Sequence, residues 1–401
     1  MKISKWINQR VPIGAFFKHH LSEYYVPKNL NFWYLFGVFS LVVLVNQLIS
    51  GFFLVMYYTP TGDGAFDSIE FIMREVPFGW LIRYLHTTGA SAFFVVVYLH
   101  MYRSIMYGSY QKPREILWLS GCVLFLLLMA ESYTGYVLPW GQMSFWATKV
   151  IISIVEIIPL VGDSLSLWVM GDLMVSEVTL HRFFAFHVIL FPAILLMMVG
   201  LHIVFLHCVG SNNPDGITSP KPKDGQAPPG HVPFHPYITA KDLAYVMLFL
   251  ALFLSVVFYA PKMGGYFIEA ENYAPANPLV TPHHIRPTWY LSPFFAILRS
   301  IPSQGLGAAA MALSIVLLFF LPWMDKSPVR SIRYKGLRCK IALAIFTISF
   351  IGLGVVGNLS PSNAVVIWGR IFTIGYFSFF VLMPWYTRFD HFKKPKRFTQ
   401  L

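Results

Sequence analysis

The chain has 401 residues, of which 56% are hydrophobic and only 12% are charged. Soluble domains carry about 25% charged residues, so this composition excludes an ordinary soluble globule and indicates an integral membrane protein. The formal net charge of +12 is expected to lie against acidic phospholipid headgroups. Nucleic acid is not an expected partner.

Apolar runs long enough to cross about 30 Å of hydrocarbon predict eight membrane helices and an all-α, polytopic fold. These runs fall near residues 32–57, 84–107, 117–138, 179–206, 243–260, 304–324, 339–357 and 365–385. Eight spans place both termini on one side. Because Lys and Arg are concentrated in the terminal segments and in the connections on that side, both termini are predicted to be cytoplasmic. Residues 1–31 are polar, and we expect no signal peptide there.

The first and second spans each carry a pair of like residues separated by fourteen positions. The pairs are Gly37 with Gly51 and His86 with His100. Fourteen residues cover about 21 Å of a helix and return to within about 40° of the same face. Arg83 and Arg103 each lie three positions from a histidine. They suit charge-assisted bonds to haem propionates, although snorkelling to the interface would also place arginine there.

The third and fourth spans repeat this arrangement. The pairs are Gly121 with Gly135, fourteen apart, and His187 with His202, fifteen apart. Facing helices would hold two histidine pairs at two depths. A single histidine or glycine is more often a packing residue, but intramembrane ionisable residues are costly and usually functional. The matched spacing therefore predicts two bis-histidine haem sites and favours glycines that admit flat porphyrin faces.

Two outer connections are not plain loops. The stretch SFWATKVIISIVEIIPLVGD, broken at Pro159 and Gly162, predicts a helix lying on the outer surface. Residues 261–303 are rich in proline and aromatic residues and too apolar for a solvent loop, so we expect them to cover a pocket.

The chain has three scattered cysteines, Cys122, Cys208 and Cys339. They form no CxxC motif, so neither covalent haem attachment nor an iron–sulfur site is expected within this chain. Any such centre is expected to come from a partner chain.

Several segments together carry a specific signature. They are RYLHTTGAS, GYVLPWGQMSFW, TLHRFFAFH, GSNNP, AKDL, and PTWY followed by AILRSIP. With these segments the whole chain resembles the cytochrome b family, the haem-bearing core of quinol:cytochrome c oxidoreductase (cytochrome bc) complexes. The resemblance implies quinol oxidation near the outer face, with one electron passing to a Rieske iron–sulfur partner and the other crossing two haems b to an inner quinone. His86 and His187 would then ligate the low-potential haem, and His100 and His202 the high-potential haem.

The resemblance also implies two quinone sites. The inner site would comprise His207, Ser211, Lys241 and Asp242, of which His207 and Asp242 are suited to relay protons. The outer site would comprise Tyr136, Met143, Ala147, residues 287–290 including Pro287 and the catalytic Tyr290, and Phe295.

Three outer positions depart from the usual family residues. Thr288 replaces a glutamate and cannot accept a proton near neutral pH, Ala147 replaces a common glycine, and Phe295 replaces a common tyrosine. We therefore expect Glu131 to act as the substitute proton acceptor, because burial near the outer helix end would raise its pKa. Glu156 is the alternative.

The histidine spacing on the fourth span is a further departure, because some relatives have fourteen rather than fifteen. The extra residue adds about 100° of rotation. We expect a wide turn or a tilt near Pro192 to restore the facing of His187 and His202.

We expect residues 1–220 to form a dihaem four-helix bundle with an outer surface helix, and residues 221–401 to form a four-helix quinone-site and packing region. The expected partners are a Rieske protein, a cytochrome c-type subunit and phospholipid, in a dimeric complex of the bacterial inner membrane. The alternatives are a dihaem membrane anchor of a quinone-linked dehydrogenase and a histidine-relay transporter, which would be colourless.

Overall fold

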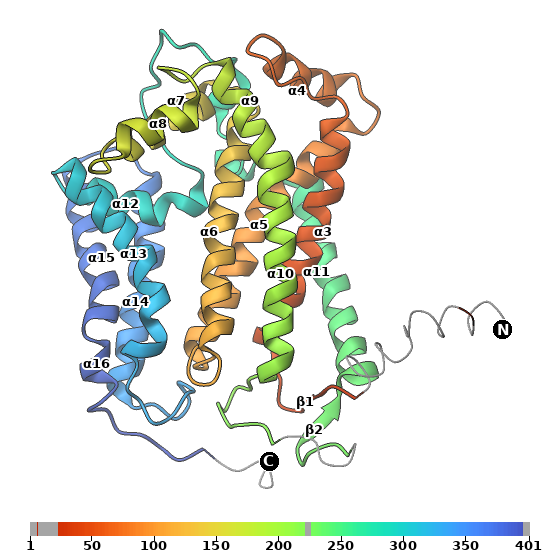
Figure 1. Cartoon of the computed structure of the whole chain (residues 1–401), viewed down its shortest axis with the longest axis vertical. Helices are drawn as coiled ribbons and strands as arrows, with labels where there is room; N and C mark the ends of the chain where they lie inside the picture. Colours follow the sequence, from red (N-terminus) through yellow and green to blue (C-terminus); the bar gives the residue numbers. More distant parts are fainter. Residues whose placement is uncertain (1–5, 7–22, 221–225, 396–401) are drawn as a thin grey trace.

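The computed structural model describes residue 6 and residues 23–220 and 226–395. In these ranges, eight helical segments are long and apolar enough to cross a membrane, and they run side by side along the long axis (Figure 1). They are α3 (Phe36–Val55), α5 (Gly79–Met106), α6 (Glu115–Val137), α9 (Glu177–Ala185) continued by η3 (Phe186–Leu190) and α10 (Phe191–Val209), α11 (Thr239–Tyr259), α13 (Gln304–Met324), α14 (Leu337–Asn358) and α15 (Asn363–Val381). The predicted all-α, polytopic fold is confirmed. Lys2, Lys5, Arg10 and Lys18, part of the basic amino terminus, lie outside the described residues.

The first four spans form a bundle in which α3 packs along α5, and α6 packs along α10. Small residues permit this close approach, as is usual where lipid provides no hydrophobic drive for helix association. On α5, a Cβ at Gly89 would collide with the side chains of Asn46 and Gln47 of α3. The amide of Asn46 also donates to the Leu85 carbonyl at 2.9 Å.

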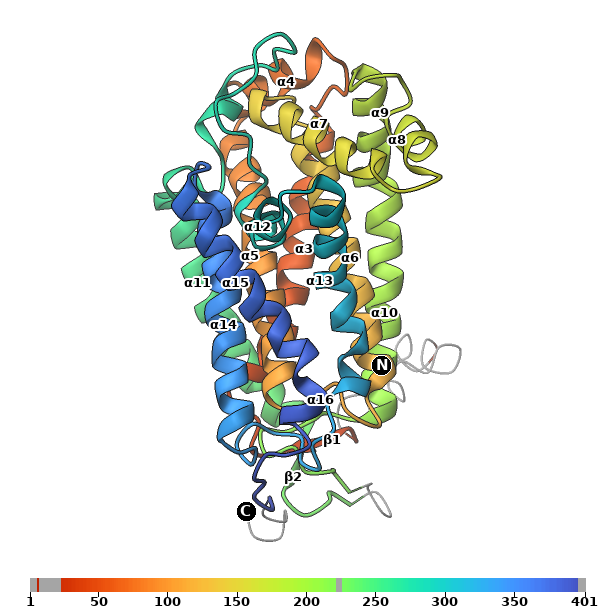
Figure 2. The ribbon, with the colours of Figure 1, turned by 90° about the vertical axis from the view of Figure 1, so that its left-hand side faces the viewer.

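The fifth span, α11, packs against α5 and α3. The fifth span therefore adjoins the first bundle. Only α13, α14 and α15 gather in the C-terminal group, around the short helix α12 (Ser292–Ser300) (Figure 2). The boundary at residue 220 itself stays a prediction.

The helix α12 joins the two groups of spans. On α14, a Cβ at Gly357 would meet the backbone of Ser292, and on α15 a Cβ at Gly369 would meet the Ser300 hydroxyl. These glycines therefore let α12 sit directly against both spans. From α12, the Phe294 ring lies 6.1 Å from the ring of Phe125 on α6.

The end of the bundle that the sequence predicts to be the outer end is covered by α4 (Gly64–Arg74), α7 (Gln142–Glu156) and α8 (Gly162–Met170) (Figure 1). The chain breaks between α7 and α8 over residues 157–161, as Pro159 and Gly162 predict. At Gly162, a Cβ would collide with the Glu156 carbonyl oxygen, so the tight turn requires glycine. The predicted surface helix is therefore confirmed as two helices.

The inner end holds a small antiparallel sheet of β1 (Tyr25–Pro27) and β2 (His231–Pro233). The terminal helix α16 (Met383–Tyr386) lies at the same end (Figure 1). The described chain thus begins and ends on one side, as an even number of spans requires.

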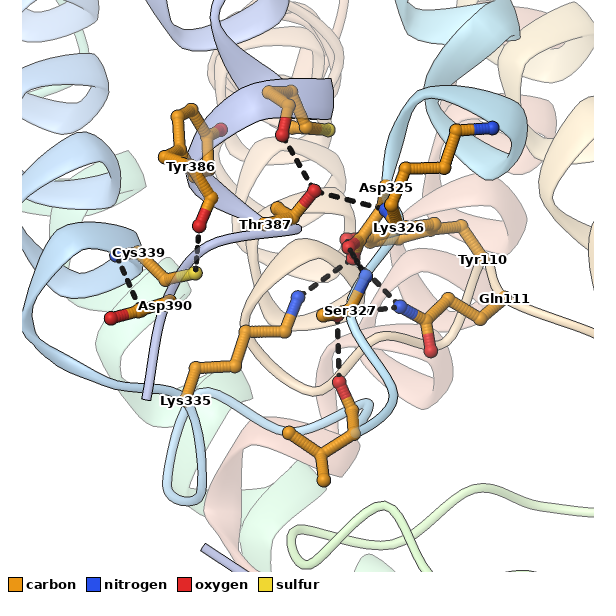
Figure 3. Close-up of polar contacts among 12 residues, drawn as sticks. Tyr110, Gln111, Asp325, Lys326, Ser327, Lys335, Cys339, Tyr386, Thr387 and Asp390 are labelled. Carbon is orange, nitrogen blue, oxygen red and sulfur yellow. Dashed lines mark hydrogen bonds and ion pairs between the residues drawn. The ribbon is translucent and has the colours of Figure 1, made fainter. Parts of the chain in front are cut away.

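A buried ion pair closes the inner end (Figure 3). Lys335 Nζ lies 2.7 Å from the carboxylate of Asp325, and the side chains are 6% and 0% exposed, respectively. The Tyr110 hydroxyl donates to the same carboxylate at 2.6 Å, and the Gln111 amide donates at 2.7 Å. Burial raises the pKa of Asp325, but Lys335, the Tyr110 hydroxyl and the backbone N–H of Ser327 outweigh burial, so the pKa is lowered. This network ties the connection after α5 to the connection between α13 and α14.

Candidate functional site

His86 of α5 and His187 of η3 form the outer histidine pair. Their ring centroids are 6.0 Å apart, and their ring planes are perpendicular. This separation accommodates two metal–nitrogen bonds of about 2 Å each on opposite sides of one metal. No group of three or more His, Cys, Asp or Glu side chains that could hold a bare ion occurs within the described residues. The pair therefore suits a metal that brings its remaining ligands with it.

Hydrogen bonds fix which ring nitrogen of the histidines is available. The Ser50 hydroxyl donates to the Asn46 carbonyl at 2.6 Å, so its oxygen accepts from His86 Nδ1 at 2.9 Å. In the inner pair, Ser120 donates to the Leu117 carbonyl at 2.9 Å and accepts from His202 Nδ1 at 2.8 Å. A proton on Nδ1 leaves Nε2 unprotonated, which is the form that binds a metal.

The inner pair, His100 and His202, lines a cavity of ≈ 420 Å³ together with Arg103. The Arg103 guanidinium lies 4.5 Å from the Tyr34 ring centroid, and its Nε is buried without a hydrogen-bond partner in the described part of the chain. A buried donor lacking a partner favours an anionic ligand. The cavity therefore fits a haem with its propionate toward Arg103.

Arg83 occupies the corresponding position near the outer pair. It is 6% exposed, and it forms none of the ion pairs found among residues 23–220 and 226–395. A buried, unpaired guanidinium is costly. This position is therefore also suited to an anionic group such as a propionate.

The four predicted glycines each face one histidine. A Cβ built on Gly37 would lie 3.2 Å from His100 Cε1, on Gly51 3.2 Å from His86 Cε1, and on Gly121 3.4 Å from His202 Cε1. On Gly135, a Cβ would collide with His187. Each of these glycines therefore makes room for an imidazole. Their predicted contact with a porphyrin face stays a prediction.

The expected wide turn on the fourth span is confirmed. Residues 186–190, which include His187, form the π-helix η3, and Pro192 follows at the start of α10. A π turn holds one residue more than an α turn. It therefore absorbs the fifteenth residue and lets His187 and His202 lie on the same side of the span.

The inner cavity also contains all the predicted inner quinone-site residues, His207, Ser211, Lys241 and Asp242. Sequence reasoning missed Tyr24, which lines the same cavity. Its ring stacks on His207 with centroids 4.5 Å apart, and its hydroxyl lies 3.1 Å from the Ser211 hydroxyl. Burial raises the pKa of Tyr24. Tyr24 reaches the cavity because it directly precedes β1, and it belongs to no sequence motif that would have predicted this position.

A second cavity, of ≈ 320 Å³, lies between α6, α7, the segment before α12, and α13. Of the predicted outer-site residues, Ala147, Pro287 and Phe295 line it. The expectation that residues 261–303 cover a pocket is confirmed in this part. Most of the lining side chains are apolar, which suits a hydrophobic ligand.

The other predicted outer residues lie beside this cavity rather than on its wall. Met143 is buried, and the Tyr290 ring stacks on Phe94 with centroids 3.9 Å apart. The Tyr136 hydroxyl donates to Glu269 at 2.9 Å. These side chains are already engaged with protein neighbours.

Comparison with known proteins identifies the family. A model described as "Cytochrome b/b6/petB" matches residues 21–210, and one described as "Cytochrome b(C-terminal)/b6/petD" matches residues 275–377. The chain belongs to the cytochrome b family. It is 50% identical to cytochrome b of Allochromatium vinosum over 98% of this chain and 97% of that protein. It is 46% identical to cytochrome b of Rickettsia typhi, over 95% and 93%.

The structure agrees with this family assignment. It resembles a chain of a hyperthermophilic respiratory complex III with a TM-score of 0.89 and 39% identity, over 96% of this chain and 99% of that chain. The protein is therefore a haem-binding, multi-pass membrane subunit of a quinol:cytochrome c oxidoreductase. It works in respiratory electron transport as one subunit of a larger complex.

Two carboxyl groups lie near the outer site of this cytochrome b. Neither Glu131 nor Glu269 lines the outer cavity itself. The Glu131 Oε1 lies 3.1 Å from His187 Nδ1. Glu269 is 1% exposed and accepts hydrogen bonds from Tyr136 and Asn272. Burial raises the pKa of Glu269. Sequence reasoning missed this residue, although two glutamates at the start of an apolar, proline-rich cover were a usable signal.

Proposed function

We propose that the chain binds two haems b, one between His86 and His187 and one between His100 and His202. The observations that carry this proposal are the facing rings of His86 and His187, 6.0 Å apart, and the cavity that His100 and His202 both line. The unpartnered Nε of Arg103 supports it. When bound, each haem supplies reversible one-electron transfer. The chain would hold the rings of His86, His187 and His202 in place through the hydrogen bonds on their Nδ1 atoms.

The inner cavity is proposed as the site of quinone reduction, at the high-potential haem of His100 and His202. Reduction of a quinone to a quinol takes up two electrons and two protons. His207 and Asp242 line the cavity and carry exchangeable protons. Lys241 donates to the Leu30 carbonyl at 2.7 Å and so fastens the segment before α3 beside the cavity.

The outer cavity is proposed as the site of quinol oxidation. One electron would pass to a Rieske iron–sulfur protein, and the other to the low-potential haem of His86 and His187. Both protons must leave the quinol, and Thr288 cannot accept one near neutral pH. A carboxylate elsewhere is therefore needed.

We assign the proton acceptor to Glu269 in preference to Glu131. The raised pKa of Glu269 brings it toward the working range of a general base. Arg286, which lines the cavity, acts on Glu269 electrostatically. The Glu131 carboxylate is instead directed at His187. Tyr136, hydrogen-bonded to Glu269, links it to α6 beside the cavity.

The proposed setting is a dimeric complex in a bacterial inner membrane, with both termini cytoplasmic. A Rieske protein and a cytochrome c-type subunit would be its redox partners, and acidic phospholipid would contact the basic inner face. Such a complex would contribute to proton translocation, because it would take up protons at the inner site and release protons at the outer site.

The test is haem content. A reduced-minus-oxidised spectrum of the purified complex should show two haems b, and the His202→Leu variant should lose one of them while His86 and His187 keep the other. Retention of both haems in this variant would reject the assignment.

A further inference from the structure

The outer pair contains a contact that the inner pair lacks. Glu131 Oε1 lies 3.1 Å from His187 Nδ1, and the two side chains are 18% and 16% exposed, respectively. The Glu131 backbone carbonyl is also 3.0 Å from the same nitrogen. One residue of α6 therefore holds this ring through both its main chain and its carboxylate. Its Oε2 is buried without a hydrogen-bond partner in the described ranges.

In the contact between His187 and Glu131, the imidazole is the hydrogen-bond donor and the carboxylate is the acceptor. A histidine that binds a metal through Nε2 carries its proton on Nδ1, and a carboxylate is the strongest common acceptor for that proton. Such a bond fixes the ring orientation and makes the ligand more basic. A more basic ligand, with a negative charge behind it, stabilises the oxidised iron because the oxidised form carries one more positive charge.

We propose that Glu131 is a positioning residue for the outer haem, which fixes the His187 ring and lowers the reduction potential of that haem relative to the inner one. The inference rests on the proposed binding of haem by His86 and His187. It assigns to the Glu131 carboxylate a role through the ligand, distinct from the proton acceptor proposed for Glu269.

The Nδ1 atoms of the inner pair, His100 and His202, lie next to groups that carry no negative charge. His202 Nδ1 meets the neutral hydroxyl of Ser120 at 2.8 Å. His100 Nδ1 lies 3.4 Å from the Arg103 guanidinium, whose positive charge disfavours the oxidised iron. The charges next to the ligands therefore differ in sign between the two depths. Arg83 carries a positive charge three residues before His86 on α5, and it is present in every variant compared below.

The experiment is a redox titration of both haems in the whole complex, with the electron paramagnetic resonance signal of the oxidised outer haem recorded in parallel. Glu131→Gln removes the charge and keeps the size of the side chain. Changes in partners behind a ligand commonly alter metal affinity by about 10- to 100-fold. We expect about a tenfold shift of the outer haem toward the reduced form, equal to about 59 mV for a one-electron couple, with the inner haem unchanged.

Ser120→Ala is the matched control, because it removes the Nδ1 partner of an inner ligand on the same helix without removing a charge. It should leave the outer potential unchanged. An outer haem that is present in Glu131→Gln with its potential and resonance signal unmoved would overturn the inference. Finding two haems in the parent complex would show that the proposed haem binding itself is correct. An unmoved potential in Glu131→Gln would then count against the role of Glu131 alone.

If Glu131→Gln loses the outer haem altogether, a second variant decides whether the charge of Glu131 is the cause. This variant is Glu131→Asp, which keeps the charge on a shorter side chain. Retention of the outer haem by Glu131→Asp would support a role for the carboxylate. Loss from both variants would overturn the inference, because it would show that the shape of the side chain matters and its charge does not.

Discussion

Replacing Gly135 by alanine should displace His187 and weaken the outer haem site selectively. A Cβ at Gly135 would lie 2.8 Å from His187 Nδ1 and 2.9 Å from Nε2, closer than carbon normally approaches. The ring cannot swing away without cost, because Glu131, one turn earlier on α6, holds Nδ1 at 3.0 and 3.1 Å. Gly121→Ala is the matched control, since its Cβ would meet His202 Cε1 at 3.4 Å, near ordinary contact.

The magnitude follows from these distances. Overpacking a tight site costs about 1–3 kcal/mol, which corresponds to about 5- to 150-fold weaker retention of the outer haem. Alanine also favours a helix over glycine by about 1 kcal/mol, but this gain is common to both variants. The difference between Gly135→Ala and Gly121→Ala therefore isolates the collision.

The assay is the ratio of haem to protein in the purified complex, with the two haems resolved by redox titration. Gly135→Ala should lose the outer haem or shift its potential, and Gly121→Ala should resemble the parent. The reasoning is refuted if Gly135→Ala retains both haems at parental potentials, or if Gly121→Ala is affected equally.

Three further predictions follow from the structure. We expect the parent to oxidise quinol faster as pH increases through the raised pKa of Glu269. Glu269→Gln should slow quinol oxidation and remove that rise, and a parental pH profile of turnover would contradict this. Ala147→Gly should increase sensitivity to rigid, planar methoxyacrylate-type inhibitors of the outer site by about 5- to 150-fold, and equal inhibitor titrations would show that the methyl does not restrict the cavity that it lines. Lys335→Met should leave Asp325 buried and unpaired and cost about 3–5 kcal/mol, measured as a lower midpoint of thermal unfolding in detergent. Because the pKa of Asp325 is lowered in the folded protein, the stabilisation by this pair is present above the ordinary aspartate pKa of about 3.9 and is lost as pH falls through the folded value. Lys335→Met should lack that loss.

The sequence alone determined the features that depend on local periodicity. Apolar runs specify the eight spans because the membrane must cover each of them. The helical repeat places His86 and His100 on one face, and the extra residue before His202 predicted either a wide turn or a tilt near Pro192. Family motifs added the inner quinone-site residues, which the structure brings to one cavity.

Tertiary structure decided how the helices sit against one another. Within lipid, the faces that meet other helices and the faces that meet acyl chains are both apolar, so hydropathy cannot distinguish them. The sequence therefore could not place α11 beside the first bundle, or direct Glu131 at His187 while its neighbour Ala130 lines the outer cavity. Tyr24 and Glu269 reach their sites from distant connections, whose paths are fixed only by packing against several spans at once.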